Sequence, residues 1–74
     1  MSLSVAQKKF LFENFSLSDY NIKTMSKEMW NNIKRECMVI EGTEYEKAET
    51  SNTAVSLKGR IAEQLVDLSF SDLK

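Results

Sequence analysis

The sequence predicts an all-α fold, a small bundle of three main helices, with a short fourth helix at 43–49 as an alternative. The chain of 74 residues has no proline and only two glycines, so few residues interrupt a helix. Its apolar side chains recur at intervals of three and four, which is the spacing of one helix face. We expect residues 1–74 to form one domain, because this length suits a single small core.

The first helix is expected at about 4–15, with Ser4 as its N-cap. The apolar side chains on one side of it are Val5, Leu11, Phe12 and Phe15. Phe10 lies off this stripe. We therefore expect Phe10 to find its cover elsewhere, with a partner as one source.

The central segment predicts one long helix at about 19–37, extending at most to 41, with Ser18 as its N-cap. Its apolar stripe consists of Ile22, Met25, Met29, Ile33 and Cys37. Because the stripe stays in phase across Ser26, we favour a continuous helix. The alternative breaks the segment at 24–26 and makes Ser26 the N-cap of a second helix, which is the outline of a helix-turn-helix.

The stretch at about 38–47 admits two interpretations. In one, Val39-Ile40 and Glu44-Tyr45 are the strands of a short β-hairpin around Gly42. In the other, Gly42 ends the preceding helix and Thr43 to Glu46 form the capping box of a new one. In either case, residues 50–53, TSNT, are predicted to be a linker or the N-cap region of the next helix.

The last helix is expected at about 53–69. Its stripe consists of Ala54, Leu57, Ile61, Leu65 and Leu68. Gly59 lies inside this helix at a cost of about 1 kcal/mol relative to alanine. We infer that this glycine lets another backbone come close.

The composition argues against catalysis. With no histidine and one cysteine, the chain lacks the usual general base, an intrachain disulfide and a Cys/His zinc site. Cys37 falls within an apolar stripe, which predicts a small core residue rather than a reactive thiol. We therefore expect no enzyme, no cofactor, no metal and no small-molecule ligand.

One local resemblance points in another direction. Residues 58–66, KGRIAEQLV, resemble the opening helix of Holliday-junction resolvases and related metal-dependent nucleases. The resemblance implies that Glu63 assists an active-site metal. It covers nine of the 74 residues, and the acidic and lysine-bearing strands of that family do not follow. The chain would then be an N-terminal fragment of such a nuclease, which is the most remote of the alternatives.

The compartment is expected to be the cytoplasm. A free, buried thiol suits a reducing environment, and the sequence has neither a signal-peptide pattern nor a membrane-spanning apolar run. No contact with a membrane is expected.

Protein–protein contact is the function that the sequence favours. So short a chain builds a marginal core, and self-association as a homodimer, or a protein partner, would supply the remaining burial. Residues 1–35 carry six bases and three acids, whereas residues 36–74 carry four bases and eight acids. Two such halves attract each other between copies. We predict a non-enzymatic regulator or adaptor whose interface includes Phe10, Tyr20, Trp30 and Phe70.

A helix-turn-helix DNA-binding regulator of phage or bacterial type is the second hypothesis. On a helix, one polar face carries Lys27, Asn31, Asn32, Lys34 and Arg35. Asparagine suits adenine, arginine suits guanine, and lysine suits phosphate. The acidic side chains of Glu41, Glu44 and Glu46 follow closely and would repel a phosphate backbone.

Overall fold

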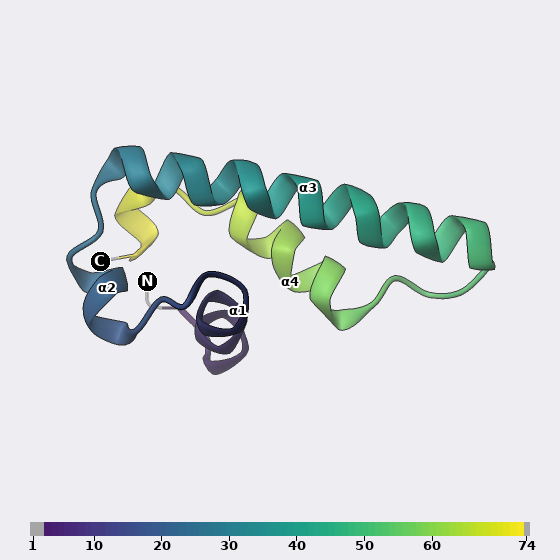
Figure 1. Cartoon of the computed structure of the whole chain (residues 1–74), viewed down its shortest axis with the longest axis horizontal. Coiled ribbons are helices and arrows are strands. Elements are labelled where there is room, and N and C mark those ends of the chain that lie inside the picture. Colours follow the sequence, from purple (N-terminus) through teal and green to yellow (C-terminus); the bar gives the residue numbers. More distant parts are fainter. Residues whose placement is uncertain (1–2, 74) are drawn as a thin grey trace.

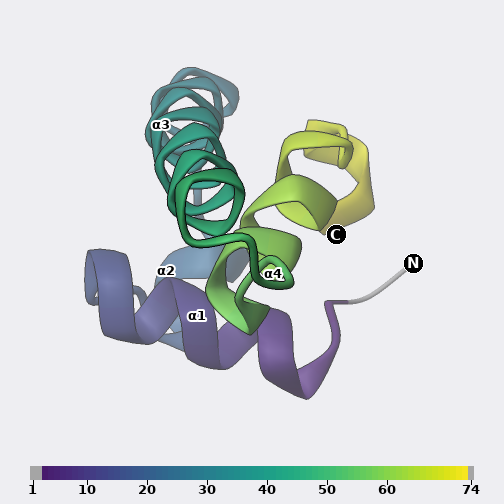
Figure 2. The same ribbon diagram turned by 90° about the vertical axis from the view of Figure 1, so that its right-hand side faces the viewer.

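Four α-helices and a C-terminal 3-10 helix make up the computed structural model, which describes residues 3–73. The elements are α1 (Val5–Phe15), α2 (Asp19–Lys23), α3 (Lys27–Ser51), α4 (Leu57–Val66) and η1 (Phe70–Leu73). α3 runs along the longest dimension, α4 packs beneath it, and α1 crosses on the far side of α4 (Figures 1 and 2). No strand occurs in residues 3–73. The predicted all-α fold is confirmed, and the alternative of a β-hairpin at about 38–47 is wrong.

All four α-helices begin after a serine. The N-caps are Ser4, Ser18, Ser26 and Ser56, and each hydroxyl accepts a hydrogen bond from the backbone N–H three residues later. Serine is favoured here because its side chain satisfies a donor that has no partner within the helix. The predicted caps Ser4 and Ser18 are confirmed.

The central segment is broken at 24–26, so the continuous helix at 19–37 is wrong and the alternative is confirmed. Thr24 ends α2, with its hydroxyl donating to the Tyr20 carbonyl at 2.9 Å, and Ser26 is extended at the start of α3. The bend changes which side chains face inward. Trp30 is fully buried, whereas Met29, expected in the stripe, is 49% exposed.

α3 passes through Gly42 without interruption and ends at Ser51. The predicted stop at Gly42 and the capping box at Thr43 are therefore wrong. The residues around Gly42 include β-branched Val39, Ile40 and Thr43, so local propensity does not explain the continuous helix. α4 packs against α3 just beyond Gly42, at Glu44 and Tyr45, and this tertiary contact outweighs the cost of one glycine. Asn52 then ends the helix in the left-handed region, with φ of 53°, which asparagine tolerates well. The break expected at 50–53 lies there.

α4 is shorter than predicted. It begins at Leu57 rather than 53, because Ser56 caps it with an extended backbone and residues 54–56 adopt no helical structure. Gly59 sits where α4 meets α3. A Cβ added to Gly59 would lie 2.7 Å from Glu44 Cβ and 2.9 Å from Val55 Cγ1. The close approach inferred from this glycine is confirmed.

The core lies between α3, α4 and α1. Its buried apolar side chains are Leu3, Phe10, Leu11, Leu17, Ile22, Met25, Trp30, Ile33, Cys37, Ile61, Ala62, Leu65 and Leu73. Phe10, expected off the stripe and covered from elsewhere, is buried within the chain itself and packs edge-on against Phe15 at a ring-centroid distance of 6.3 Å. Phe12, expected inside, is 62% exposed. The inward stripe of α1 is thus centred on Phe10 and Leu11, which corrects the predicted one.

Candidate interaction surfaces

The four side chains predicted to form a protein interface lie in different surroundings. Phe10 and Trp30 belong to the core, and the Trp30 indole N–H donates to the Leu68 carbonyl at 3.3 Å. Phe70 is half-buried against the core. Only Tyr20, on α2, is largely exposed. In this conformation Trp30 offers a partner no surface and Phe10 only a trace at the edge of a groove, because the chain itself covers them.

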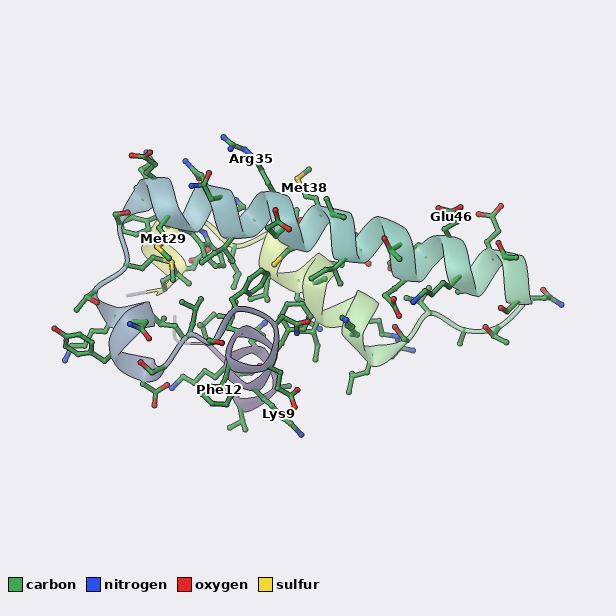
Figure 3. All side chains as sticks on the ribbon, viewed as in Figure 1. Lys9, Phe12, Met29, Arg35, Met38 and Glu46 are labelled. Carbon is green, nitrogen blue, oxygen red and sulfur yellow. The ribbon has the colours of Figure 1, made fainter. Side chains whose placement is uncertain are left out.

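A first exposed apolar surface, which we call the α1 face, consists of Val5, Lys9 and Phe12. These residues are spaced by four and three, so they share one side of the helix. Phe12 and Lys9 point away from the rest of the molecule on the side opposite α3 (Figure 3). The capping box at Ser4 and Gln7 and the inward packing of Leu11 fix the rotation of α1, and this leaves Phe12 outside.

A shallow groove borders the α1 face. It lies between α1 and the start of α4 and is lined by Ala6, Lys9, Phe10, Glu13, Asn14, Leu57, Lys58 and Ile61. Leu57, the first residue of α4, was expected in the inward stripe but is mostly exposed at the edge of the groove. The groove enlarges the apolar area that α1 presents.

A second exposed surface, which we call the outer stripe, runs along α3 and consists of Arg35, Met38, Val39, Gly42 and Glu46. Arg35, Met38 and Glu46 project from the side of α3 that faces away from the other helices (Figure 3). Met38 and Val39 are 55% and 64% exposed. The outer stripe therefore carries apolar side chains at its centre and opposite charges at its two ends.

The residues predicted to contact nucleic acid lie together in the first half of α3. Lys27, Asn31, Asn32 and Arg35 are exposed, and Lys34 is half-buried. Their position follows from the break at Ser26, which makes this segment the start of a helix. The Arg35 guanidinium donates to the Asn32 side-chain oxygen at 3.0 Å. The arrangement is chemically able to contact phosphate or base edges, and it shares Arg35 with the outer stripe.

Polar side chains join α3 to α4 on the acidic side of the molecule. The Ser56 hydroxyl donates to one Glu44 carboxylate oxygen at 2.8 Å, and Lys47 Nζ lies 3.2 Å from the other. The hydrogen bond from Ser56, followed by that from Lys47, lowers the pKa of Glu44. Ser56 also caps α4, so Glu44 supports the residue that starts the next helix.

Glu63, the residue singled out by the nuclease resemblance, takes part in the same junction. Its carboxylate accepts a hydrogen bond from the Tyr45 hydroxyl, which raises the pKa of Tyr45. Residues 3–73 contain no group of three or more Cys, Asp or Glu side chains placed to hold a metal ion. In this arrangement Glu63 links α4 to α3.

Cys37 is completely buried in the middle of α3. Burial, with a smaller effect from the negative charge of Glu36, raises the pKa of its thiol to about 11. A thiol in this environment is protonated at neutral pH and out of reach of solvent. Its predicted role as a core residue is confirmed by its burial.

The chain matches no known protein family, no curated protein sequence and no solved structure.

Within residues 3–73, no helix has both the length and the apolar character needed to cross a membrane.

Proposed function

We propose that this chain is a small non-enzymatic regulator or adaptor that acts through protein–protein contacts. One observation carries the proposal: exposed apolar side chains gather on two opposite sides of the molecule, the α1 face and the outer stripe (Figure 3). Single exposed apolar residues are ordinary, but grouped ones edged by charge mark contact surfaces. Two such surfaces allow one chain to contact two other chains.

The α1 face has the make-up of a contact centre. Phe12 presents a large rigid ring that costs little conformational entropy to fix, and aromatic side chains carry much of the binding energy of protein interfaces. Val5, two turns away on the same side of α1, is 85% exposed, and Lys9, between them in the sequence, lines the groove. A protein surface with an apolar pocket and an acidic edge would complement this arrangement.

Site-specific cross-linking in the cells that make the protein tests this proposal. Phe12 is replaced by a photoreactive phenylalanine analogue, and the same analogue is placed at Thr53, an exposed position between α3 and α4. We expect light to produce a discrete protein adduct from position 12 and none from position 53. Competition by added native chain, but not by a Phe12→Ser chain, should remove the adduct. Equal yields from both positions would contradict the proposal.

A DNA-binding regulator is the second candidate, because a short break at 24–26 separates α2 from α3, as a turn separates the two helices of a helix-turn-helix. Several observations argue against DNA binding. α2 has only five residues, Glu28 lies in the first turn of α3, and the chain as a whole carries a net charge of −1. Affinity for DNA comes largely from neutralised phosphates, and acids beside the contact residues reduce it.

DNA retention at low and moderate salt tests the second candidate. A duplex of mixed sequence is offered to the native chain and to a Lys34→Glu/Arg35→Glu variant. The protein–protein proposal expects no retention of either at moderate salt. Retention by the native chain that disappears in the variant would make DNA binding the primary function.

A further inference from the structure

Neither packing nor backbone conformation requires a glycine at position 42 within residues 3–73. A Cβ added there would meet no atom within 4 Å, and the backbone does not adopt a positive φ at this residue. A glycine inside a helix nevertheless costs about 1 kcal/mol relative to alanine. Gly59 repays a similar cost by allowing α3 and α4 to meet. The exposed position of Gly42 in the outer stripe suggests a close contact with something outside the chain.

The outer stripe has a self-complementary order. Its residues recur at three and four, so they lie along one side of α3 over about 16 Å. Reversing the direction of the helix about the point between residues 40 and 41 exchanges Arg35 with Glu46 and Val39 with Gly42. Neither Arg35 nor Glu46 forms an ion pair with another residue of the described chain. Both charges are therefore free to pair with a second molecule.

We propose that the outer stripe is the interface of a symmetric homodimer in which two α3 helices pack antiparallel. Arg35 of each copy faces Glu46 of the other, and Val39 of each copy packs over Gly42 of the other. A two-fold axis requires this reciprocity, because residue i contacts j whenever j contacts i. This inference rests on the proposed function and names the occupant of one of its two surfaces.

Charge selects the antiparallel direction. In a parallel pair Arg35 would face its own copy, and so would Glu46, and like charges at an interface repel. In the antiparallel pair each end of the stripe meets the opposite sign. The missing Cβ at Gly42 allows the two helix axes to approach to about 8 Å, at the near end of the usual range. Met38 lies beside the contact and covers its edge.

The interface is small, so the dimer is expected to be weak. One helix pair buries less than about 1,200 Å², which is typical of transient association. The other helices lie on the far side of α3 and do not obstruct the contact (Figure 3). We expect a micromolar dissociation constant that rises with salt, because the ion pairs lie at the exposed rim.

Sedimentation equilibrium of the full chain across concentration tests the dimer. Arg35→Glu and Glu46→Arg should each weaken association at least tenfold, because two-fold symmetry places each change in the interface twice. The combined R35E/E46R variant restores opposite signs and should associate within about threefold of the native chain. Lys9→Glu, the same charge change on the α1 face, is the matched control and should leave association unchanged.

Gly42 provides an independent variant. Gly42→Leu should weaken association at least tenfold, while circular dichroism shows an unchanged helical fold because the position is open in the single chain. A native chain that stays monomeric at millimolar concentration overturns the proposal. So does a dimer that R35E and E46R leave intact, or one that the double variant does not restore. Loss of DNA retention in R35E, with a monomeric native chain, would assign the outer stripe to DNA instead.

The dimer and the broader function can fail separately. A monomeric native chain that still yields a protein adduct from position 12 removes the dimer and leaves the protein–protein function standing. A dimer with the expected charge dependence, combined with no adduct at position 12, removes the α1 face as a contact surface and leaves the dimer standing.

Discussion

The two glycines lie in opposite environments, one at a tight helix–helix contact and the other on an open helix surface. Gly59 lies where two helices touch, and its missing side chain is what allows Glu44 and Val55 to sit against α4. Gly42 lies in the open on α3. Alanine is a better helix former than glycine at either place, so the difference between the two substitutions isolates the packing.

Gly59→Ala should destabilise the fold by about 1–2 kcal/mol, because the overpacking of the α3–α4 contact exceeds the gain of about 1 kcal/mol in helix propensity. Gly42→Ala should instead stabilise the single chain by about 0.5–1 kcal/mol. Urea unfolding at low micromolar concentration measures both free energies. Equal effects of the two substitutions would mean that the α3–α4 contact has room to spare.

Cys37 should be nearly inert in the folded chain. With a pKa of about 11, roughly one thiol in a thousand is ionised at pH 8, and the side chain has no exposed surface. We expect iodoacetamide at pH 8 to modify the native chain at least 100-fold more slowly than the chain in urea, as followed by mass spectrometry. Comparable rates would show that α3 opens readily around this residue.

At the scale of the element, serine caps decide where the helices begin. The apolar spacing is in phase from Ile22 to Cys37 and by itself favours one helix. Ser26 competes with that pattern by accepting the Met29 N–H at 3.1 Å and taking an extended backbone. The bend allows Ile22 and Met25 to be buried before α3 begins. Within α3, Trp30 rather than Met29 then packs into the hydrophobic core.

Ser26→Ala should lower the free energy of unfolding by about 1 kcal/mol, because the cap of α3 is lost. Ser26→Asp should retain most of the stability, since the carboxylate accepts the same hydrogen bond and suits the helix N-terminus. Urea unfolding again provides the measurement, with Ser51→Ala as the control in the last turn of the same helix. An alanine variant as stable as the native chain would indicate that packing alone sets the bend.

At the scale of the whole molecule, the α3–α4 junction couples stability to pH. The folded state holds the Glu44 carboxylate with two hydrogen-bond donors, and its pKa is therefore lower than in the unfolded chain. A second carboxylate with a lowered pKa lies outside this junction, in η1. Asp72 accepts hydrogen bonds there from the backbone N–H and the hydroxyl of Ser69. A lowered carboxyl pKa contributes stability above its unfolded value and loses it as pH falls through the folded value.

Glu44→Gln should therefore be less stable than the native chain at pH 7, and the difference should shrink as pH falls below about 4.5, the ordinary pKa of a glutamate. Thermal unfolding at pH 7 and at acid pH measures the two gaps. Glu49→Gln, the same substitution at an exposed position near the end of α3, is the control and should be about as stable as the native chain at pH 7. A gap that widens in acid would contradict the assignment.

The two exposed surfaces also belong to this largest scale. The outer stripe exists only because residues 38–47 are helical, since only then do Met38 and Gly42 share one side. The sequence was compatible with both a helix and a β-hairpin in this stretch. The α1 face depended on the rotation of α1, which is set by the burial of Phe10 and Leu11 against the other helices. Of the four aromatic side chains predicted to form an interface, Phe10 and Trp30 are buried in the core and Phe70 packs partly buried against it.

By itself, the sequence determined the helical class, the caps at Ser4 and Ser18, the buried Cys37 and the close approach at Gly59. Each of these depends on a local preference: few helix breakers, a side chain that satisfies its own backbone, apolar spacing, or the absence of a Cβ. Only the tertiary structure decided between the bend and the long helix, carried α3 through Gly42, and chose Phe10 and Trp30 for the core. Those choices depend on which helix faces another, because burial against a neighbour contributes more than the small differences in local propensity that separate the alternatives.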